Sequence, residues 1–247
     1  MIFMAQIGYG YGSEYQLLRF LGHHRRELEQ IISEQIGEGT FEWEDFDYAD
    51  PKSVISGDKE LMGLSFLEHL YPVQYPAVKA EYENYKIYHR NAWQNWDAIF
   101  THNGTLYLVE AKAHISELSS GSEEHGDHSR EEILRYFKDQ LPELPVSRVW
   151  LQDYYQMANR LATAALLNKN GIKTKLLYVY FVNGYRKRVV ENKDRKERLY
   201  ETVNLNATEE QFRIAIQDEM NALGISHDSV ASLLAPPVFV NAEPKRH

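Results

Sequence analysis

The stretch Asn95-Trp-Asp-Ala-Ile-Phe-Thr-His-Asn-Gly-Thr-Leu-Tyr-Leu-Val-Glu-Ala-Lys-Ala113 predicts two short strands that are joined by a tight turn. The turn is predicted at His102-Asn103-Gly104, because Asn-Gly is among the strongest signals for a two-residue hairpin loop. In the second strand, residues at i and i+2 point to the same face, so the side chains of Glu110 and Lys112 project side by side. Their neighbours are mostly apolar on both faces, as expected of an interior strand.

Charged side chains in an interior strand are costly unless they bind a metal or pair with each other. The first strand carries a further carboxylate, Asp97, close to this pair. One interpretation is a cross-strand ion pair in a plain hairpin. The other is a functional site, because a conflict between a buried pattern and charged residues is where function is expected.

The chain has 247 residues, enough for one large domain with a full hydrophobic core. It contains no cysteine, which excludes disulfides, thiolate metal sites and cysteine nucleophiles. Neither a basic, apolar leader nor a run of 18 apolar residues is found in the sequence, so we expect no signal peptide and no membrane span. A cytoplasmic protein is the corresponding expectation.

Helices are predicted where apolar residues recur with helical spacing between capping signals. The predicted helices cover residues 13–36, 59–70, 129–141, 149–169 and 208–223, and Ser13, Ser129 and Thr208 each have a Gln or Glu three residues later. Pro72 and Pro76 are expected to break the second helix. Residues 79–91 fit either a helix or a strand, and residues 115–128 are expected to form a mobile polar loop.

Further strands are predicted at residues 175–182 and 237–241, with a return segment through Val190 after the Asn183-Gly184 turn. Residues 38–60 are acidic and aromatic without a clear period, which predicts an irregular excursion. Together these elements predict one α/β domain over residues 1–247 with a mixed sheet. Residues 38–90 would be an insertion before the hairpin, and residues 205–247 a C-terminal extension.

Asp97, then twelve residues, then Glu110-x-Lys112 at the end of a hairpin resembles the PD-(D/E)XK nuclease superfamily. The resemblance covers the chain from the first helix to about residue 190. It implies a restriction-endonuclease-like core, in which helices flank a mixed central β-sheet. The proline that this family places before the aspartate is absent, and Trp96 stands there instead.

The resemblance implies that Asp97 and Glu110 bind Mg²⁺, with the backbone carbonyl of Ala111 as a third oxygen ligand. Mg²⁺ prefers hard oxygen ligands and keeps several waters, so two carboxylates are sufficient, and Mn²⁺ is expected to substitute. The metal would lower the pKa of a bound water. Lys112 would then favour hydroxide and stabilise the charge that develops on the phosphodiester.

Two other residues match places where the family has functional groups. Glu14 shares a helical stripe with Leu17 and Leu21, where the family often supplies a further acidic ligand. The alternative for Glu14 is a first-turn carboxylate that the helix dipole favours. Gln156 matches a glutamine that approaches the substrate in some branches, and its alternative is a neutral polar edge between buried and wet helix faces.

Seven basic and three acidic residues lie between positions 186 and 198, in a chain with a formal net charge of −9. Within this cluster Arg186, Lys187, Arg188, Lys193 and Arg195 are candidates for contacts with nucleic acid phosphates, although such runs are also common on solvated surfaces. The acidic balance argues against tight independent binding to DNA. A protein partner or a homo-oligomer that delivers the substrate is therefore compatible with the sequence.

Zinc is not expected at the histidine pairs. His23 and His24 are neighbours on a helix and point in different directions, and His125 and His128 lie in the predicted polar loop without an obvious third ligand. The sequence therefore predicts an Mg²⁺-dependent nuclease that hydrolyses phosphodiester bonds of nucleic acid, DNA in preference to RNA. The alternative is a catalytically inactive module with the same fold that binds nucleic acid or protein.

Overall fold

The computed structural model describes residues 12–44, 61–85, 94–119, 127–183, 185–192, 197–204 and 207–242. In chain order its elements are α1 (Ser13–His23), α2 (Arg25–Ile36), β1 (Phe41–Trp43), β2 (Leu61–Met62), α4 (Leu67–Leu70), α5 (Tyr75–Glu83), β3 (Asn95–Trp96), β4 (Ala98–His102), β5 (Thr105–Lys112), the 3₁₀ turn η1 (Ile115–Glu117), α6 (Asp127–Gln140), the 3₁₀ turn η2 (Arg148–Leu151), α7 (Tyr155–Lys169), β6 (Thr174–Val182), β7 (Tyr185–Asn192), β8 (Glu197–Asn204), α8 (Glu209–Leu223), α9 (His227–Val230) and β9 (Val238–Asn241). No helix among these is long and apolar enough to cross a lipid bilayer.

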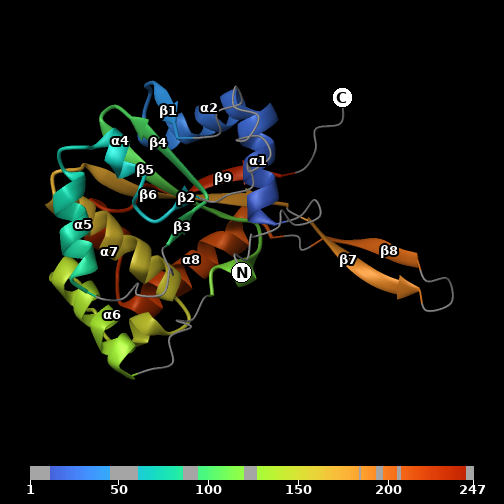
Figure 1. Cartoon of the computed structure of the whole chain (residues 1–247). Coiled ribbons are helices and arrows are strands. Elements are labelled where there is room, and N and C mark those ends of the chain that lie inside the picture. The colour runs from blue at the N-terminus through green and yellow to red at the C-terminus, as the bar shows by residue number, and fades with distance from the viewer. Residues whose placement is uncertain are drawn as a thin grey trace.

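A five-stranded, strongly curled sheet forms the centre of the molecule, in the order β1-β4-β5-β6-β9 (Figure 1). The strand β4 runs antiparallel to both β1 and β5, whereas β6 runs parallel to β5 and β9 parallel to β6. All eight residues of β5 are buried. The structure thus confirms an α/β protein with a mixed sheet and the interior position of the strand that carries Glu110 and Lys112.

The predicted hairpin turn is confirmed. Asn103 and Gly104 have φ angles of 49° and 71°, and His102 pairs with Thr105 across the turn. Positive φ at both central residues is the geometry that favours Asn-Gly in such turns. The strand before the turn is shorter than predicted, because β3 pairs with β2 in a separate two-stranded sheet. Asp97 therefore lies at the bend between β3 and β4 rather than within a strand.

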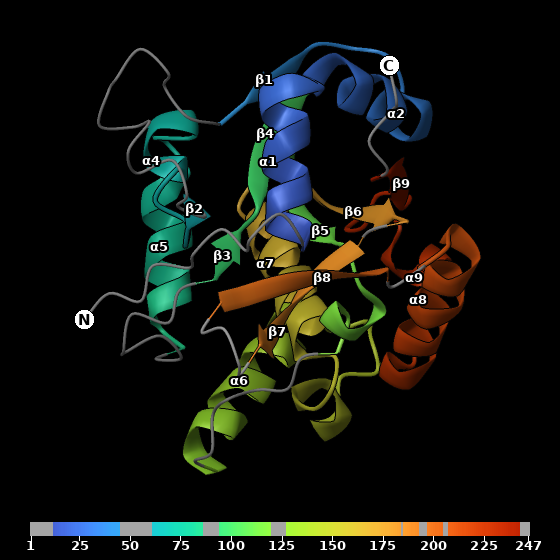
Figure 2. The ribbon, with the colours of Figure 1, turned by 90° about the vertical axis from the view of Figure 1, so that its right-hand side faces the viewer.

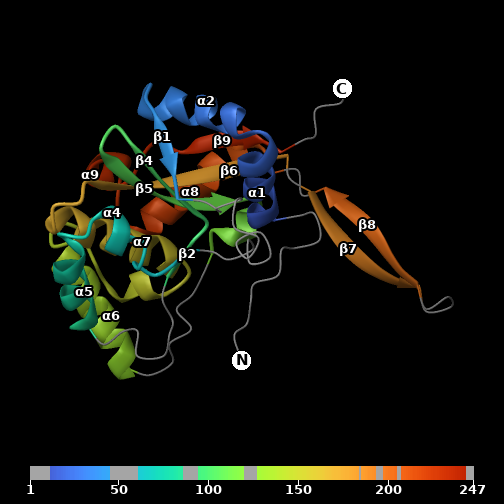
Figure 3. The same ribbon diagram turned by 45° about the horizontal axis from the view of Figure 1, so that its top comes forward.

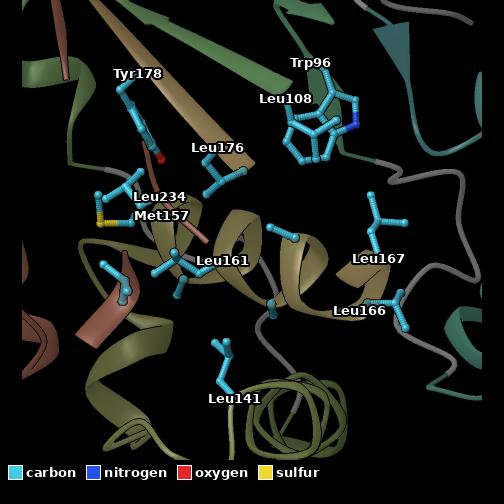
Figure 4. Close-up of a cluster of buried hydrophobic side chains, with 14 of the residues drawn as sticks. Trp96, Leu108, Leu141, Met157, Leu161, Leu166, Leu167, Leu176, Tyr178 and Leu234 are labelled. Atoms are coloured by element: carbon cyan, nitrogen blue, oxygen red, sulfur yellow. The ribbon is translucent and has the colours of Figure 1, made fainter. Parts of the chain in front are cut away.

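Helices cover both faces of the sheet, and alternate residues of β5 belong to two different cores. On one face, α1 and α2 pack against a cluster that includes Val109 and Ala111 (Figures 1 and 2). On the other face, α6, α7 and α8 pack against a larger cluster that includes Leu106 and Leu108. Figure 4 shows part of this second core, where Leu161 of α7 lies below the sheet.

Several predicted helix ends are confirmed. The helix α2 ends before Gly37, α6 ends before Pro142, and α7 ends at Asn170-Gly171. Thr208 forms the predicted capping box with Gln211 at the start of α8, and Gly224 ends that helix in the left-handed conformation. In each case the end coincides with a local sequence signal.

Other boundaries were predicted wrongly. The first helix is two helices that meet at His24, and Gly12 is its N-cap, so Ser13 makes no capping bond. The helix α6 begins at Asp127, two residues before Ser129. Its residue Glu132 accepts a hydrogen bond from Arg135. The predicted helix over 149–169 is divided into η2 and α7, which starts at Tyr155.

The segment before the hairpin also differs from the prediction. Phe41–Trp43 form the edge strand β1, paired with β4, where an irregular excursion was expected. Pro76 does not break a helix but lies in the first turn of α5, a position that tolerates the missing N–H. Ile115–Glu117 form a 3₁₀ turn within the predicted polar loop, of which residues 120–126 lie outside the described residues.

The strands β7 and β8 form an antiparallel ribbon that is separate from the central sheet. Figures 1 and 3 show this ribbon projecting away from the body of the molecule. It follows β6, whose carboxyl end lies beside the carboxyl end of β5 because the two strands are parallel and Lys112 is in register with Tyr180. The ribbon therefore starts at the same edge of the sheet as the Glu110–Lys112 pair.

Candidate active site

Glu110 and Lys112 lie at the carboxyl end of β5, on the face of the sheet that α7 covers. Their side chains are nearly inaccessible, with 5% and 6% of the residue surface exposed. Lys112 Nζ donates a hydrogen bond of 3.2 Å to Glu110 Oε1. The predicted side-by-side pair is thus present, and it is a buried ion pair.

Arg160 on α7 is a third charged residue in this cluster, and the sequence analysis missed it. Its Nε donates to Glu110 Oε2 at 2.9 Å, and its Nη2 donates to the backbone carbonyl of Asn95 at 2.7 Å. The guanidinium also lies over the ring of Trp96, 4.7 Å from the ring centre. Arg160 is therefore hydrogen-bonded to both β3 and β5.

A sequence signal for Arg160 was available. Residues Met157 to Ala164 of α7 are all buried, and most of them are small or apolar. An arginine in such a helix needs a partner, just as a glutamate in a buried strand does. Arg160 lies next to a polar line of the predicted helix over 149–169, which consists of Gln152, Gln156, Asn159 and Thr163.

Gln156 joins the two charges of β5. Its Oε1 accepts a hydrogen bond of 2.6 Å from Lys112 Nζ, and its Nε2 donates to Glu110 Oε1. The structure thus brings this predicted site residue to the pair, whereas Gln152, one turn earlier, is exposed. The side-chain amide can serve both ions because it offers a donor and an acceptor.

Asp97 lies next to the same segment. Its Oδ2 accepts a hydrogen bond of 2.6 Å from the backbone N–H of Ala111, the residue between Glu110 and Lys112. Its own N–H donates to the carbonyl of Val109. The side chain of Asp97 thus accepts a hydrogen bond from a backbone N–H of β5. It does so at the place where the chain turns from β3, which pairs with β2, into β4.

The remaining predicted site residues are less closely associated with this cluster. Glu14 is half-buried in the first turn of α1, which packs on the opposite face of the sheet. That end of α1 lies near the carboxyl end of β5 in Figures 1 and 2. Arg186, Lys187 and Arg188 belong to β7, and Lys193 and Arg195 lie outside the described residues.

The charges of the cluster are mutually compensated. Burial alone would raise the pKa of Glu110, but the charges of Arg160 and Lys112 outweigh it and hold that pKa below its ordinary value. Burial lowers the pKa of Arg160, and the Glu110 carboxylate more than reverses this effect. Glu110 is therefore charged at neutral pH although it is buried.

The donors present are compatible with a hard divalent cation. Asp97, which is bonded to the backbone of Ala111, and the preceding residue Glu110 supply two carboxylates, and Mg²⁺ in proteins is commonly bound through one or two carboxylates and several waters. Within the described part of the chain, no group of three or more His, Asp or Glu residues could hold a metal ion. Both carboxylates are hard oxygen donors, the kind of ligand that Mg²⁺ prefers.

A surface hollow of about 250 Å³ lies beside the start of α7. It is lined by residues of α6, η2 and the turn that follows: Arg130, Glu131, Leu134, Arg148, Leu151 and Gln152. The Glu110–Lys112 pair does not line it.

Comparisons of this chain with protein-family models, with curated proteins and with solved structures found no match.

Proposed function

We propose that this protein is a metal-dependent nuclease that hydrolyses phosphodiester bonds of nucleic acid, with DNA as the preferred substrate. One observation carries the proposal: the Asp97 carboxylate bonds to the backbone of Ala111, between Glu110 and Lys112. Two carboxylates and a lysine from adjacent chain segments thus meet at one end of the hairpin. The mixed sheet between helices is compatible with a restriction-endonuclease-like core.

In this proposal Asp97 and Glu110 hold the metal ion, with the Ala111 carbonyl as a further oxygen donor. The bound ion would supply positive charge for the scissile phosphate and acidify a water molecule. Lys112 orients that water, and its ammonium stabilises negative charge in the transition state. Gln156 holds Lys112 in place through a hydrogen bond of 2.6 Å.

The ribbon of β7 and β8 is the proposed arm for nucleic acid binding. The basic residues Arg186, Lys187 and Arg188 lie in β7, near its root at the carboxyl end of β6. A two-stranded ribbon is narrow enough to enter the major groove of B-form DNA, whereas the deep groove of A-form RNA is too narrow for side chains to read. This difference supports DNA as the preferred substrate.

A second candidate function follows from how Glu110 is bonded. Both of its carboxylate oxygens already accept bonds from cations, Lys112 at one oxygen and Arg160 at the other. An acid held in this way can serve a purely structural role. The alternative proposal is therefore a nuclease-fold module that binds nucleic acid or protein without cleaving it.

Cleavage assays distinguish the two candidates. The purified protein is incubated with plasmid, linear duplex, single-stranded DNA and RNA, with Mg²⁺ or Mn²⁺ and then with a chelator. We expect metal-dependent cleavage that falls by at least about 100-fold in Asp97→Asn, Glu110→Gln and Lys112→Met, since each removes a charge but nearly keeps the shape of the side chain. Glu42→Gln on the exposed side of β1 is the matched control and should cleave like the wild type.

Metal binding to the folded protein is measured in parallel through the melting temperature. A ligand that binds only the native state must raise it. Cleavage that persists unchanged in all three variants would contradict the proposed site. Absence of both cleavage and metal-dependent stabilisation in the wild type would favour the non-catalytic module.

A further inference from the structure

The helix α8 buries a glutamate that the proposed mechanism does not use. Its buried stripe consists of Phe212, Ile216, Met220 and Leu223, and Glu219 lies among them with 3% of its surface exposed. Among the described residues, its Oε2 has no hydrogen-bond partner. A buried, unbonded carboxyl oxygen costs free energy, so helix packing alone gives no reason for an acid at this position.

The packing of α8 brings Glu219 close to the candidate active site. The helix packs against β6, where the ring of Phe212 lies 5.1 Å from the ring of Tyr180. Tyr180 is the β6 residue in register with Lys112 of β5. The ammonium of Lys112 acts electrostatically on the Glu219 carboxyl, opposing the effect of burial.

Few charged groups surround this carboxyl. The charges of Lys112 on β5 and of Glu219 interact electrostatically, and Tyr178, Tyr180 and Tyr154 lie within electrostatic range. The turns η1 and η2 also pack against α8. They carry Glu117, which accepts a hydrogen bond from the N–H of Ala113, and the exposed Arg148. Burial raises the pKa of Glu219 to about 8, so it is mostly protonated at neutral pH.

Metal binding would upset the balance of charges around Lys112. Without the metal, the carboxylate of Glu110 neutralises Lys112 at 3.2 Å. With a divalent cation beside Glu110, the carboxylate is committed to the metal, and the added positive charge repels the ammonium. Lys112 then needs a second anion, and Glu219 is a buried acid on which its charge already acts.

We propose that Glu219 is a positioning residue that becomes the carboxylate partner of Lys112 when a divalent cation occupies the Asp97–Glu110 site. This inference rests on the proposed metal-dependent function. As Glu219 ionises, its carboxyl O–H bond breaks and the proton passes to solvent, one proton for each metal ion bound. Lys112 is thereby held between Gln156 and Glu219, where it can orient the attacking water.

Calorimetric titration of Mn²⁺ into the wild-type protein tests the proposal without relying on a variant. The titration is run near neutral pH in two buffers that differ in ionisation enthalpy. The heat difference between them counts the released protons, and we expect a number close to one. The affinity for Mn²⁺ should also rise as the pH increases toward 8 and then level off, because bound metal displaces a proton.

The variant Glu219→Gln assigns the proton to this residue. Glutamine resembles the protonated acid in shape, so we expect a folded protein that releases no proton and binds Mn²⁺ about tenfold more weakly. Glu210→Gln, an exposed acid of the same helix, is the matched control and should behave like the wild type.

Two results would overturn the inference and leave the proposed function intact: metal binding without proton release in the wild type, or unchanged proton release in Glu219→Gln. A wild-type protein that binds no Mn²⁺ would instead overturn the metal-dependent function itself, and this inference with it.

Discussion

The two glutamates Glu110 and Glu219 are buried on the same side of the sheet, yet their surroundings shift their pKa values in opposite directions. The charges of Arg160 and Lys112 hold the pKa of Glu110 below its ordinary value in spite of burial. Burial among the apolar residues of α8 raises the pKa of Glu219 to about 8, and Lys112 only partly opposes this shift. Charged partners, and not burial itself, therefore decide whether an acid is charged in this core.

Because their pKa values differ, Glu110 and Glu219 can have different roles. At neutral pH Glu110 is a fixed anion, whereas Glu219 holds a proton that it can release. Pairs of acids whose environments separate their pKa values are frequent in active sites, because one member can bind charge while the other exchanges a proton. Lys112 interacts with both acids.

Replacement of Arg160 should give the largest change in the free energy of unfolding. Arg160→Met leaves the Glu110 carboxylate buried with one cation fewer and the Asn95 carbonyl without this donor. We expect a loss of about 3 to 5 kcal/mol in the free energy of unfolding, the usual cost of breaking a buried ion pair. Urea unfolding measures it. Arg135→Met, an exposed arginine paired with Glu132, is the control and should cost less than about 1 kcal/mol.

Replacement of Glu219 on α8 should change the free energy of unfolding by a smaller amount, which depends on pH. Unfolding restores the Glu219 pKa from about 8 to about 4.5, so above pH 4.5 the unfolded chain binds fewer protons than the native one. The native state therefore loses stability as the pH rises from about 4.5 to about 8. Glu219→Gln has no proton to lose, and at pH 6.5 it should be more stable than the wild type by roughly 3 kcal/mol.

Unfolding curves for the wild type, Glu219→Gln and the control Glu210→Gln near pH 5, 6.5 and 8 measure this difference. Glu110 contributes in the opposite direction: its lowered pKa means that stability from its ion pairs is lost as the pH falls below about 4.5. A gap between Glu219→Gln and the wild type that stays constant across this range would contradict the raised pKa of Glu219.

The hairpin and its buried charges could be predicted because their signals are local. Asn103-Gly104 specified the turn, and the apolar residues around Glu110 and Lys112 indicated an interior strand. The capping box of Thr208 likewise depends on residues that are close in sequence. The position of Asp97 at a bend was missed, because β3 leaves the hairpin to pair with β2, and this pairing depends on a segment distant in sequence.

The partners of the buried charges could be predicted only in part. Gln156 was proposed from its place on a helix, but its bonds to both Glu110 and Lys112 depend on how α7 packs on β5 and β6. Arg160 and Glu219 were both missed, although each is a charged residue within a buried apolar stretch. Glu110 was identified because it is a charged residue among the apolar residues of a buried strand. The same criterion applied to the buried faces of α7 and α8 would have identified Arg160 and Glu219.

Replacement of the whole charged cluster should have the smallest effect on stability. It also separates a structural role of these charges from a chemical one. In the triple variant Glu110→Met, Lys112→Met and Arg160→Met, no buried charge of the cluster is left without a partner. Exchange of a buried ion network for apolar residues of similar volume is often neutral or stabilising. We expect a change in the free energy of unfolding between zero and a gain of roughly 2 kcal/mol, measured by urea unfolding beside Arg160→Met.

The same triple variant should have lost metal binding and cleavage, since it lacks Glu110 and Lys112. Stability retained without activity would show that the chain keeps these charges for chemistry, because packing does not require them. A triple variant as unstable as Arg160→Met would show instead that the ion network has a structural role in joining β5 to α7. That result would favour the non-catalytic module, in which Glu110 holds two cations and needs no metal.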